Sequence, residues 1–213
     1  MRTDEDLKAA VLDAALAHAA EDGFTDGLLQ RAGKEAGAGA GQLLHLFPQG
    51  AAGLVEAFSE RADTEMERRL PDLSAMKVRE RIAAAVLARL AAVRPHKEAA
   101  RRAAAFLMLP QNAPLAAKLV YQTVDAMWRA AGDTSTDFNF YTKRGILAGV
   151  YASTLVRWFN DTGEDEAETR AFLDARIENV MQFEKFKAEM RERTKGWPSF
   201  ADIMAGLRRP SAK

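Results

Sequence analysis

Apolar residues recur every three or four positions along almost the whole chain, and no stretch alternates convincingly like a half-buried strand. Near the start, Leu7, Val11, Ala15 and Ala19 share one helix face, and Gly23 ends that stripe. Short turns separate the periodic segments, which predicts an all-α helical bundle. Further helices are expected over residues 28–36, 40–46, 51–70, 74–93, 95–109, 114–131, 136–159 and 164–193, with a short one after Pro198.

Composition excludes several classes of function. Cysteine is absent, so disulfides and thiol chemistry are excluded, whereas the balance of 30 basic and 30 acidic residues argues neither for nor against a polyanionic partner. The longest apolar stretch, residues 145–156, is shorter than the ~18 residues of a membrane span. The three histidines lie far apart and no Glu-x-x-His pair occurs, so we expect no metal, no cofactor and no catalysis.

The first seventy residues resemble a known DNA-binding module. A helix, the pair GF, a short helix and then KEAGAGAGQLLHLFP before a long helix are similar to the helix-turn-helix of the tetracycline-repressor family. The positions that match that family best are Gly37, Gly41, Leu43, His45 and Phe47. The resemblance implies a tetracycline-repressor-like fold with a helix-turn-helix module at residues 1–70.

The departures from that family argue against DNA binding. The family usually has Ser or Thr at the position of Gly39 and Tyr at the position of Leu44, so hydroxyls that cap the helix and hold phosphates are missing. Residues 1–70 also hold 7 Lys or Arg against 13 Asp or Glu, which repels a phosphate backbone. We expect a retained scaffold and no DNA partner. The alternative is a ligand-sensing transcriptional repressor.

A second resemblance covers roughly residues 108–161. That stretch reads MLPQNAP, then VDAMWRAAGDTSTDFNFYTKRGILAGVYASTLVRWFND. It looks like the lipid-binding accessory protein family of ubiquinone (coenzyme Q) biosynthesis, which has a tetracycline-repressor-like fold. The resemblance implies a non-enzymatic, homodimeric protein that binds an isoprenoid or quinone lipid and presents precursors to the pathway's di-iron hydroxylase. Residues 71–195 would then be the ligand-binding bundle.

Residues 132–137, GDTSTD, are typical of the turn of a helical hairpin, with Gly132 ending the first helix. The helix that follows is apolar nearly all round, so it is either a plain core helix or the wall of a cavity. Its small residues and the soft apolar side chains of neighbouring helices, together with the resemblance, favour a lipid cavity. The candidate lipid-binding residues are Phe106, Met108, Tyr141, Gly145, Gly149, Tyr151, Phe172 and Met181.

The helix before this hairpin has a candidate partner surface. Tyr121, Val124, Asp125 and Trp128 fall on one side at helical spacings, and a tryptophan with aliphatic neighbours is typical of a binding hot spot. Alternatively, Trp128 packs on the last helix. The resemblance implies that Asp125 and Trp128 meet the hydroxylase.

The C-terminal residues, 196–213, predict a short amphipathic helix that docks on the bundle, joins a partner or lies on a membrane surface. A basic run at residues 77–102, with 8 Lys or Arg against 2 Glu, offers a second membrane contact or an ordinary solvated face. We expect a cytoplasmic protein, peripherally associated with the inner membrane of a bacterium. The candidate membrane-binding residues are Phe200, Ile203, Met204, Leu207, Arg208 and Arg209.

Overall fold

The computed structural model describes residues 3–133 and 138–194, with the backbone alone at 138–139 and 183–194. The chain forms two compact units, Met1–Asp174 and Ala175–Lys213. All regular elements in the described part are helices, which confirms the all-α class, and none of these helices combines the length and apolar character that crossing a bilayer requires. The expected C-terminal helix lies outside the described residues, and with it Phe200, Ile203, Met204, Leu207, Arg208 and Arg209.

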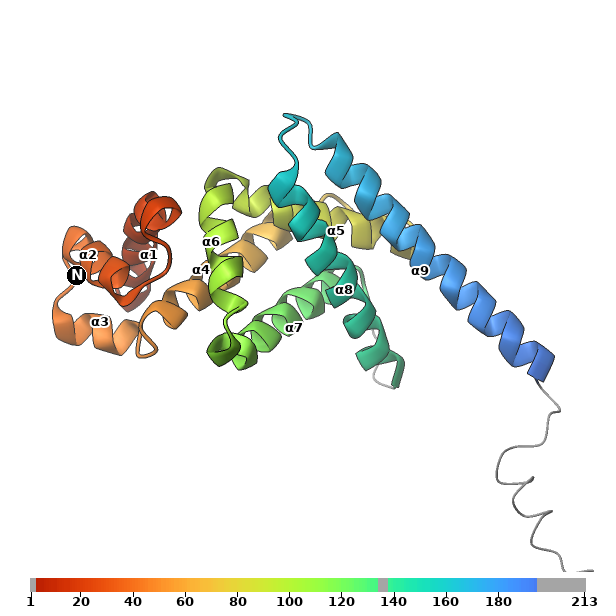
Figure 1. Ribbon diagram of the computed structural model, residues 1–213, viewed down its shortest axis with the longest axis horizontal. Coiled ribbons are helices and arrows are strands. Elements are labelled where there is room, and N and C mark those ends of the chain that lie inside the picture. The colour runs from red at the N-terminus through yellow and green to blue at the C-terminus, as the bar shows by residue number, and fades with distance from the viewer. Residues whose placement is uncertain (1–2, 134–137, 195–213) are drawn as a thin grey trace, which may run out of the picture. The chain divides into compact units, whose positions relative to one another are not determined.

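The first three helices gather at one end of the first unit, as Figure 1 shows: α1 (Asp4–Asp22), α2 (Asp26–Ala36) and α3 (Ala40–Leu46). Thr3 and Asp6 form a capping box that begins α1. Gly33 lets α2 approach α3 closely, because a Cβ there would lie 2.3 Å from a methyl carbon of Leu43. At α3 the N-cap residue, Gly39, supplies no side-chain hydrogen bond to the helix.

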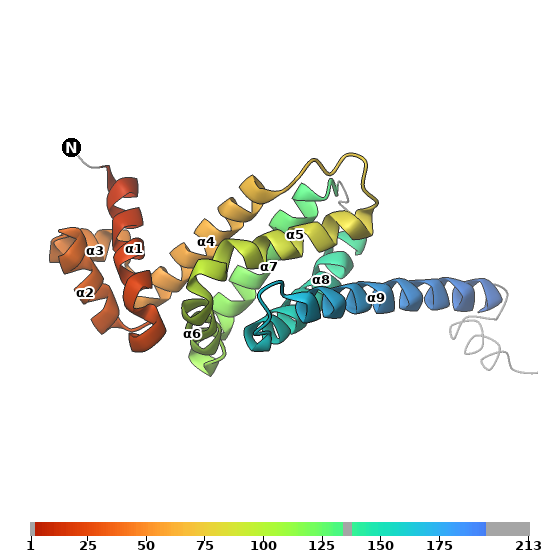
Figure 2. The same cartoon turned by 90° about the horizontal axis from the view of Figure 1, so that it is seen from above.

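The remaining helices of the first unit form the bundle: α4 (Ala51–Arg69), α5 (Val78–Val93), α6 (Lys97–Leu107), α7 (Ala113–Ala130), α8 (Phe138–Asn160) and the start of α9 (Ala167–Thr194). α4 packs against α5 and α7, and α7 packs against α8 (Figure 2). The boundary that we expected near residue 70 therefore falls inside the first unit. The second unit contains the rest of α9, from Ala175 to Thr194.

Most helix ends lie within two residues of their expected positions, and the exceptions have local causes. α5 begins at Val78 instead of residue 74, because Asp72 accepts hydrogen bonds from the backbone and hydroxyl of Ser74 and holds a turn there. The segment expected as one helix over 95–109 is a 3₁₀ turn, Arg94–His96, followed by α6. Gly132 has a φ of +83° and follows Ala131, the C-cap residue of α7, as expected of a helix-ending glycine, whereas 134–137 lie outside the described residues.

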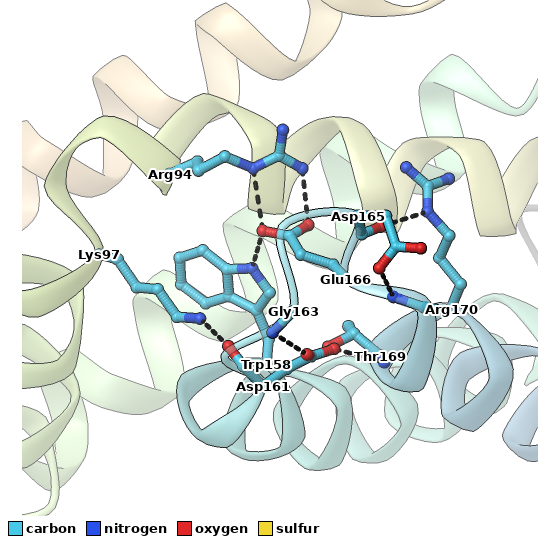
Figure 3. A network of polar contacts seen from close by, with 10 residues as sticks. Arg94, Lys97, Trp158, Asp161, Gly163, Asp165, Glu166, Thr169 and Arg170 are labelled. Atoms are coloured by element: carbon cyan, nitrogen blue, oxygen red, sulfur yellow. Dashed lines mark hydrogen bonds and ion pairs between the residues drawn. The ribbon is translucent and has the colours of Figure 1, made fainter.

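The loop between α8 and α9 is fixed by a buried glutamate, shown in Figure 3. Glu166 accepts a hydrogen bond from Nε1 of Trp158 at 2.7 Å and two from the guanidinium of Arg94, at 2.9 and 2.6 Å. Trp158 is fully buried and Glu166 nearly so. Glu166 thereby ties the end of the loop to Trp158 in α8 and to Arg94 in the 3₁₀ turn before α6, and α9 begins at Ala167 instead of the expected residue 164.

A second carboxylate completes the same loop. Asp161 accepts from the backbone and hydroxyl of Thr169, at 2.8 and 2.7 Å, and from the backbone N–H of Gly163. These hydrogen bonds, with that of the Thr169 hydroxyl the strongest, hold the pKa of Asp161 below its usual range. Lys97 donates to the carbonyl oxygen of Asp161 at 2.6 Å. The loop is therefore held by charge-assisted bonds at both of its ends.

Replacing Glu166 tests this interpretation. Glu166→Ala leaves the buried indole N–H of Trp158 without an acceptor and Arg94 without its partner. We expect the free energy of unfolding, measured by urea denaturation, to fall by about 3 kcal/mol. Glu164→Ala, an exposed residue of the same loop, is the matched control and should change it by less than ~0.5 kcal/mol. Equal effects of the two changes would contradict the role given to Glu166.

The same carboxylate makes stability depend on pH. Burial alone would raise the pKa of Glu166, but the hydrogen bonds from Arg94 and Trp158 outweigh it and hold the pKa below the ordinary 4.5. Folding therefore favours the charged form, and its contribution is present above that value and lost as the pH falls below it.

The stability gap between the parent and Glu166→Gln should accordingly be largest near pH 7 and narrow below about pH 4.5. Urea unfolding at several pH values measures it. A gap that stays constant across that range would show that the charge of Glu166 contributes nothing.

Candidate functional site

A small cavity lies inside the first unit, between α4, α5, α6, α7 and α8. Its volume is about 100 Å³. Three alanines of α6 leave the space, because Ala100, Ala103 and Ala104 carry nothing beyond a Cβ into it. The other walls are mainly apolar: Val55, Phe58, Val93, Leu107, Leu119, Val120 and Leu155.

One end of the cavity is polar. The buried Arg89 of α5 donates from Nε to Oδ1 of Asp63 in α4 at 2.6 Å, and from Nη2 to the hydroxyl and carbonyl of Ser59 at 3.3 and 3.4 Å. Thr123 of α7 donates its hydroxyl to Asp63 at 3.0 Å. Arg89, Ser59 and Thr123 all line the cavity. One charged pair thus joins three helices and faces an apolar space.

Tyr151 of α8 adds a phenol to this polar end. The residue is buried, and burial raises the pKa of its phenol, although the positive charge of Arg89 acts to lower it. The phenol therefore stays protonated at neutral pH. Burial disfavours the charge of Arg89, but Tyr151, once ionised at high pH, and Asp63 outweigh burial and raise the pKa of Arg89. Burial also raises the pKa of Asp63, and Arg89 is the main opposing influence. We call Ser59, Asp63, Arg89, Thr123 and Tyr151 the polar end of the cavity.

The structure separates the candidate lipid-binding residues. Tyr151 lines the cavity, Phe106 and Phe172 are half-buried outside its wall, and Met181 lies in the second unit. The other four are exposed: Met108, Tyr141, Gly145 and Gly149.

The separation follows from helix geometry. Residues two positions apart on a helix point about 200° apart, so Gly149 and Tyr151 cannot line the same small cavity. A Cβ added at Gly145 or Gly149 would meet no atom within 4 Å. The expectation that these glycines make room inside the bundle is therefore corrected: they lie on the outer side of α8.

The residues of the candidate partner surface also differ in how exposed they are. Tyr121 is exposed, and Asp125 and Trp128 are partly exposed. Val124 is 1% exposed, because it points into the core between α7 and its neighbours, so the expectation that it contacts a partner is corrected. Trp128 carries Lys143 over its ring at 5.4 Å, and within the described residues its buried indole nitrogen has no hydrogen-bond partner.

Asp125 belongs to an ion-pair cluster that joins α7 to α8. Arg144 is 4% exposed and pairs with Asp125 at 2.7 Å and with Asp133 at 3.3 Å. Its guanidinium carbon lies 3.3 Å from the ring centroid of Phe140. Lys143 also pairs with Asp133, at 2.9 Å. The two cations that follow the aromatic residues at the start of α8 thus fasten this helix to α7.

Most cations of the basic run at 77–102 make hydrogen bonds within the first unit. Arg89 is buried, and most of the other cations donate hydrogen bonds to distant parts of the chain. These donors are Arg81 to Ala131, Arg94 to Glu166, Lys97 to Asp161, Arg101 to Phe159 and Arg102 to Ala20. The run is therefore not a plain solvated face. Across the described residues, no group of three or more His, Cys, Asp or Glu side chains could hold a metal ion.

Sequence reasoning missed the polar end of the cavity except for Tyr151. Arg89 had a signal, because it is the only charged residue between Ile82 and Val93. A lone charge in an apolar helical run is either exposed or buried with a partner. No sequence signal marked Asp63 as buried, since charged residues surround it in the sequence.

Comparisons with known proteins confirm the second resemblance. Residues 113–184 match the COQ9 family model. The mitochondrial ubiquinone biosynthesis protein COQ9 of Rattus norvegicus is 45% identical over 97 residues, which cover 46% of this chain and 31% of that protein. The Homo sapiens protein of that name is 31% identical over 188 residues, covering 84% of this chain and 59% of that protein. The chain thus spans about a third to three fifths of the length of these relatives.

A solved structure confirms the all-α, tetracycline-repressor-like fold, without confirming the helix-turn-helix module expected at residues 1–70. The TetR transcriptional regulator from Nitrosomonas europaea superposes with a TM-score of 0.64 at 19% identity, covering 82% of this chain and 98% of that one. The expected location at the inner membrane of a bacterium is wrong by the same comparisons, because the relatives are named as mitochondrial proteins of eukaryotes such as Rattus norvegicus, Homo sapiens and Drosophila melanogaster.

The junction of α7 and α8 can be tested at Arg144. Arg144→Met removes the buried cation that pairs with both Asp125 and Asp133, and Asp133 is only 6% exposed. We expect the free energy of unfolding to fall by about 3 kcal/mol in urea denaturation. Lys143→Met, at a half-exposed neighbour, is the control and should cost less than ~1 kcal/mol. A larger loss in the control than in Arg144→Met would contradict this assignment.

Proposed function

We propose that this chain, which carries a domain of the COQ9 family of ubiquinone biosynthesis proteins, is a non-enzymatic accessory protein that binds an isoprenoid or quinone lipid. It presents the lipid to the pathway's di-iron hydroxylase at a membrane surface. The names of the relatives state a pathway and no reaction, which fits an accessory role.

The observation that carries the proposal is the cavity between α4 and α8. Five helices contribute to it, and its walls are apolar except at one end. Apolar pockets with a few convergent polar groups are typical of small-molecule sites. Leu107, Val120 and Leu155 are only half-buried, so the apolar lining continues toward the surface and offers a path for a prenyl tail.

The proposed contacts with the hydroxylase and with the membrane rest on the resemblance and on few residues. Tyr121 and Trp128 give α7 a partly exposed aromatic surface, which supports a protein partner. Asp125 is already paired with Arg144 and Arg129, so it would orient this surface more than bind across it. The proposal also includes a homodimer, which rests on the family resemblance alone.

Filling the cavity tests the lipid-binding function. Ala104→Phe adds a ring to the cavity wall, whereas Ala105→Phe adds the same ring to the exposed side of α6. Lipids that co-purify with each protein are extracted and quantified by mass spectrometry. We expect isoprenoid quinones or their precursors with the parent and the control, and about tenfold less with Ala104→Phe, since overpacking costs about 1–3 kcal/mol.

The opposite results would refute the proposal. If the parent carries no isoprenoid lipid when expressed in cells that make ubiquinone, lipid binding is wrong. If Ala104→Phe and Ala105→Phe carry equal amounts while both remain helical by circular dichroism, the lipid lies elsewhere.

A further inference from the structure

The outward side of α3 is an exposed apolar surface that takes no part in the cavity or in the candidate partner surface of α7. Ala40 and Leu44 lie one turn apart on this side, and Pro48 follows in the turn after the helix. All three are exposed, Leu44 by 70%, and all three line one groove. Exposed apolar residues that stand together, unlike scattered single ones, are typical of an interaction site.

The groove is open, has a volume of about 530 Å³ and lies between α2, α3 and the turn before α4, with Leu44 in its wall. Its apolar floor is formed by buried side chains: Leu29, Leu43 and Phe47. The polar side chains that line it are those of Asp26, Gln30 and Gln49. An apolar side chain inserted here would be sheltered from water beside Leu44, as an anchor residue is in the pocket of a protein interface.

Acidic groups surround this groove. Residues 3–50 hold 3 Lys or Arg against 8 Asp or Glu, and no Lys or Arg occurs over residues 35–60. Asp26 lines the groove itself. Asp4, in the first turn of α1, lies with Oδ2 3.5 Å from Nε2 of His45, the residue after Leu44 in α3. The apolar surface therefore has a carboxylate on each of two neighbouring helices, α1 and α2.

The sign of this charge selects the class of partner. Phosphates of nucleic acids and of anionic lipids would be repelled, and so would the same acidic surface of a second copy of the chain. Lys and Arg side chains would be attracted. A partner that also fills the groove must carry apolar side chains next to its cations, which describes a basic amphipathic helix.

The shape of the surface fits a helix. α3 has 7 residues and is therefore ~10 Å long, so the groove beside it can take about two turns of a partner helix. Such a helix inserts apolar residues at i, i+3 and i+4 into a groove of this kind. Gly41 is exposed on α3, and a Cβ there would meet no described atom within 4 Å, so no side chain blocks a close approach.

We propose that the outward side of α3 binds a cationic amphipathic helix of a partner protein. Apolar side chains of that helix enter the groove beside Leu44, and its Lys or Arg side chains lie next to Asp4 and Asp26. The proposal is independent of the lipid-binding function and of the contact proposed for α7, because it uses none of their residues.

Two synthetic peptides of about 14 residues test the class of partner. Both have leucines along one helix face, and the remaining positions are Lys in one peptide and Glu in the other. Each peptide carries a fluorescent label, and its anisotropy is measured during titration with the full chain. We expect the Leu/Lys peptide to bind about tenfold or more tightly than the Leu/Glu peptide, and high salt to weaken its binding.

Matched substitutions locate the peptide. Leu44→Ala should weaken binding of the Leu/Lys peptide by about tenfold, whereas Val156→Ala, at an aliphatic residue of α8 that is 61% exposed, should leave it unchanged. Asp4→Asn should weaken it by about threefold, and Glu164→Gln, at the exposed loop before α9, should not. All four positions are exposed, and circular dichroism checks that each variant is folded.

Several results would overturn the proposal. One is that the parent binds neither peptide, or binds the Leu/Glu peptide as tightly as the Leu/Lys peptide. Another is that Leu44→Ala and Val156→Ala bind the Leu/Lys peptide equally, which would place the peptide elsewhere. The third is flotation of the parent with vesicles of phosphatidylcholine and phosphatidylglycerol that Leu44→Ala abolishes, because the surface would then contact a membrane. None of these results bears on whether the cavity holds a lipid.

Discussion

The ion pair of Arg89 and Asp63 determines how the bundle of the first unit is built. It joins α5 to α4, and through Thr123 it also reaches α7, so three helices meet at one buried charge. A buried arginine requires its partners to stay close, because an unpaired charge in the interior is far more costly than a lost apolar contact. The small side chains of α6 then leave space beside this junction that the other helices cannot close.

α8 completes the enclosure and is attached at both of its ends by the same kind of interaction. At its start Arg144 reaches two carboxylates of the α7 region, and at its end Trp158 donates to the buried Glu166. Between these attachments the helix presents Tyr151 to the cavity. Charged groups thus set the position of an otherwise apolar helix, and apolar packing alone would allow it to rotate or slide.

The helices were predictable from the sequence, and the site was predictable only in part. Apolar periodicity depends on neighbours three and four positions away, so it locates α4 or α7 within a few residues. The partner of Arg89 lies 26 positions away, and that of Arg94 lies 72 positions away, and no local pattern reports such pairs. Periodicity also failed at α8, where apolar residues on every side hide which face is inward. Of these two positions, Tyr151 lines the cavity and Gly149 lies on the outer side of the helix.

The outward glycines of α8 have a mechanical consequence. Gly145 and Gly149 each weaken a helix interior by roughly 1 kcal/mol relative to alanine, and no neighbouring atom within 4 Å compensates. They lie between the attachment at Arg144 and the cavity residue Tyr151. The helix is therefore firmly fixed at its ends and softest one turn before the phenol that faces the cavity. Local opening at residues 145–149 would swing Tyr151 aside without breaking either attachment, so this segment is where α8 bends most easily.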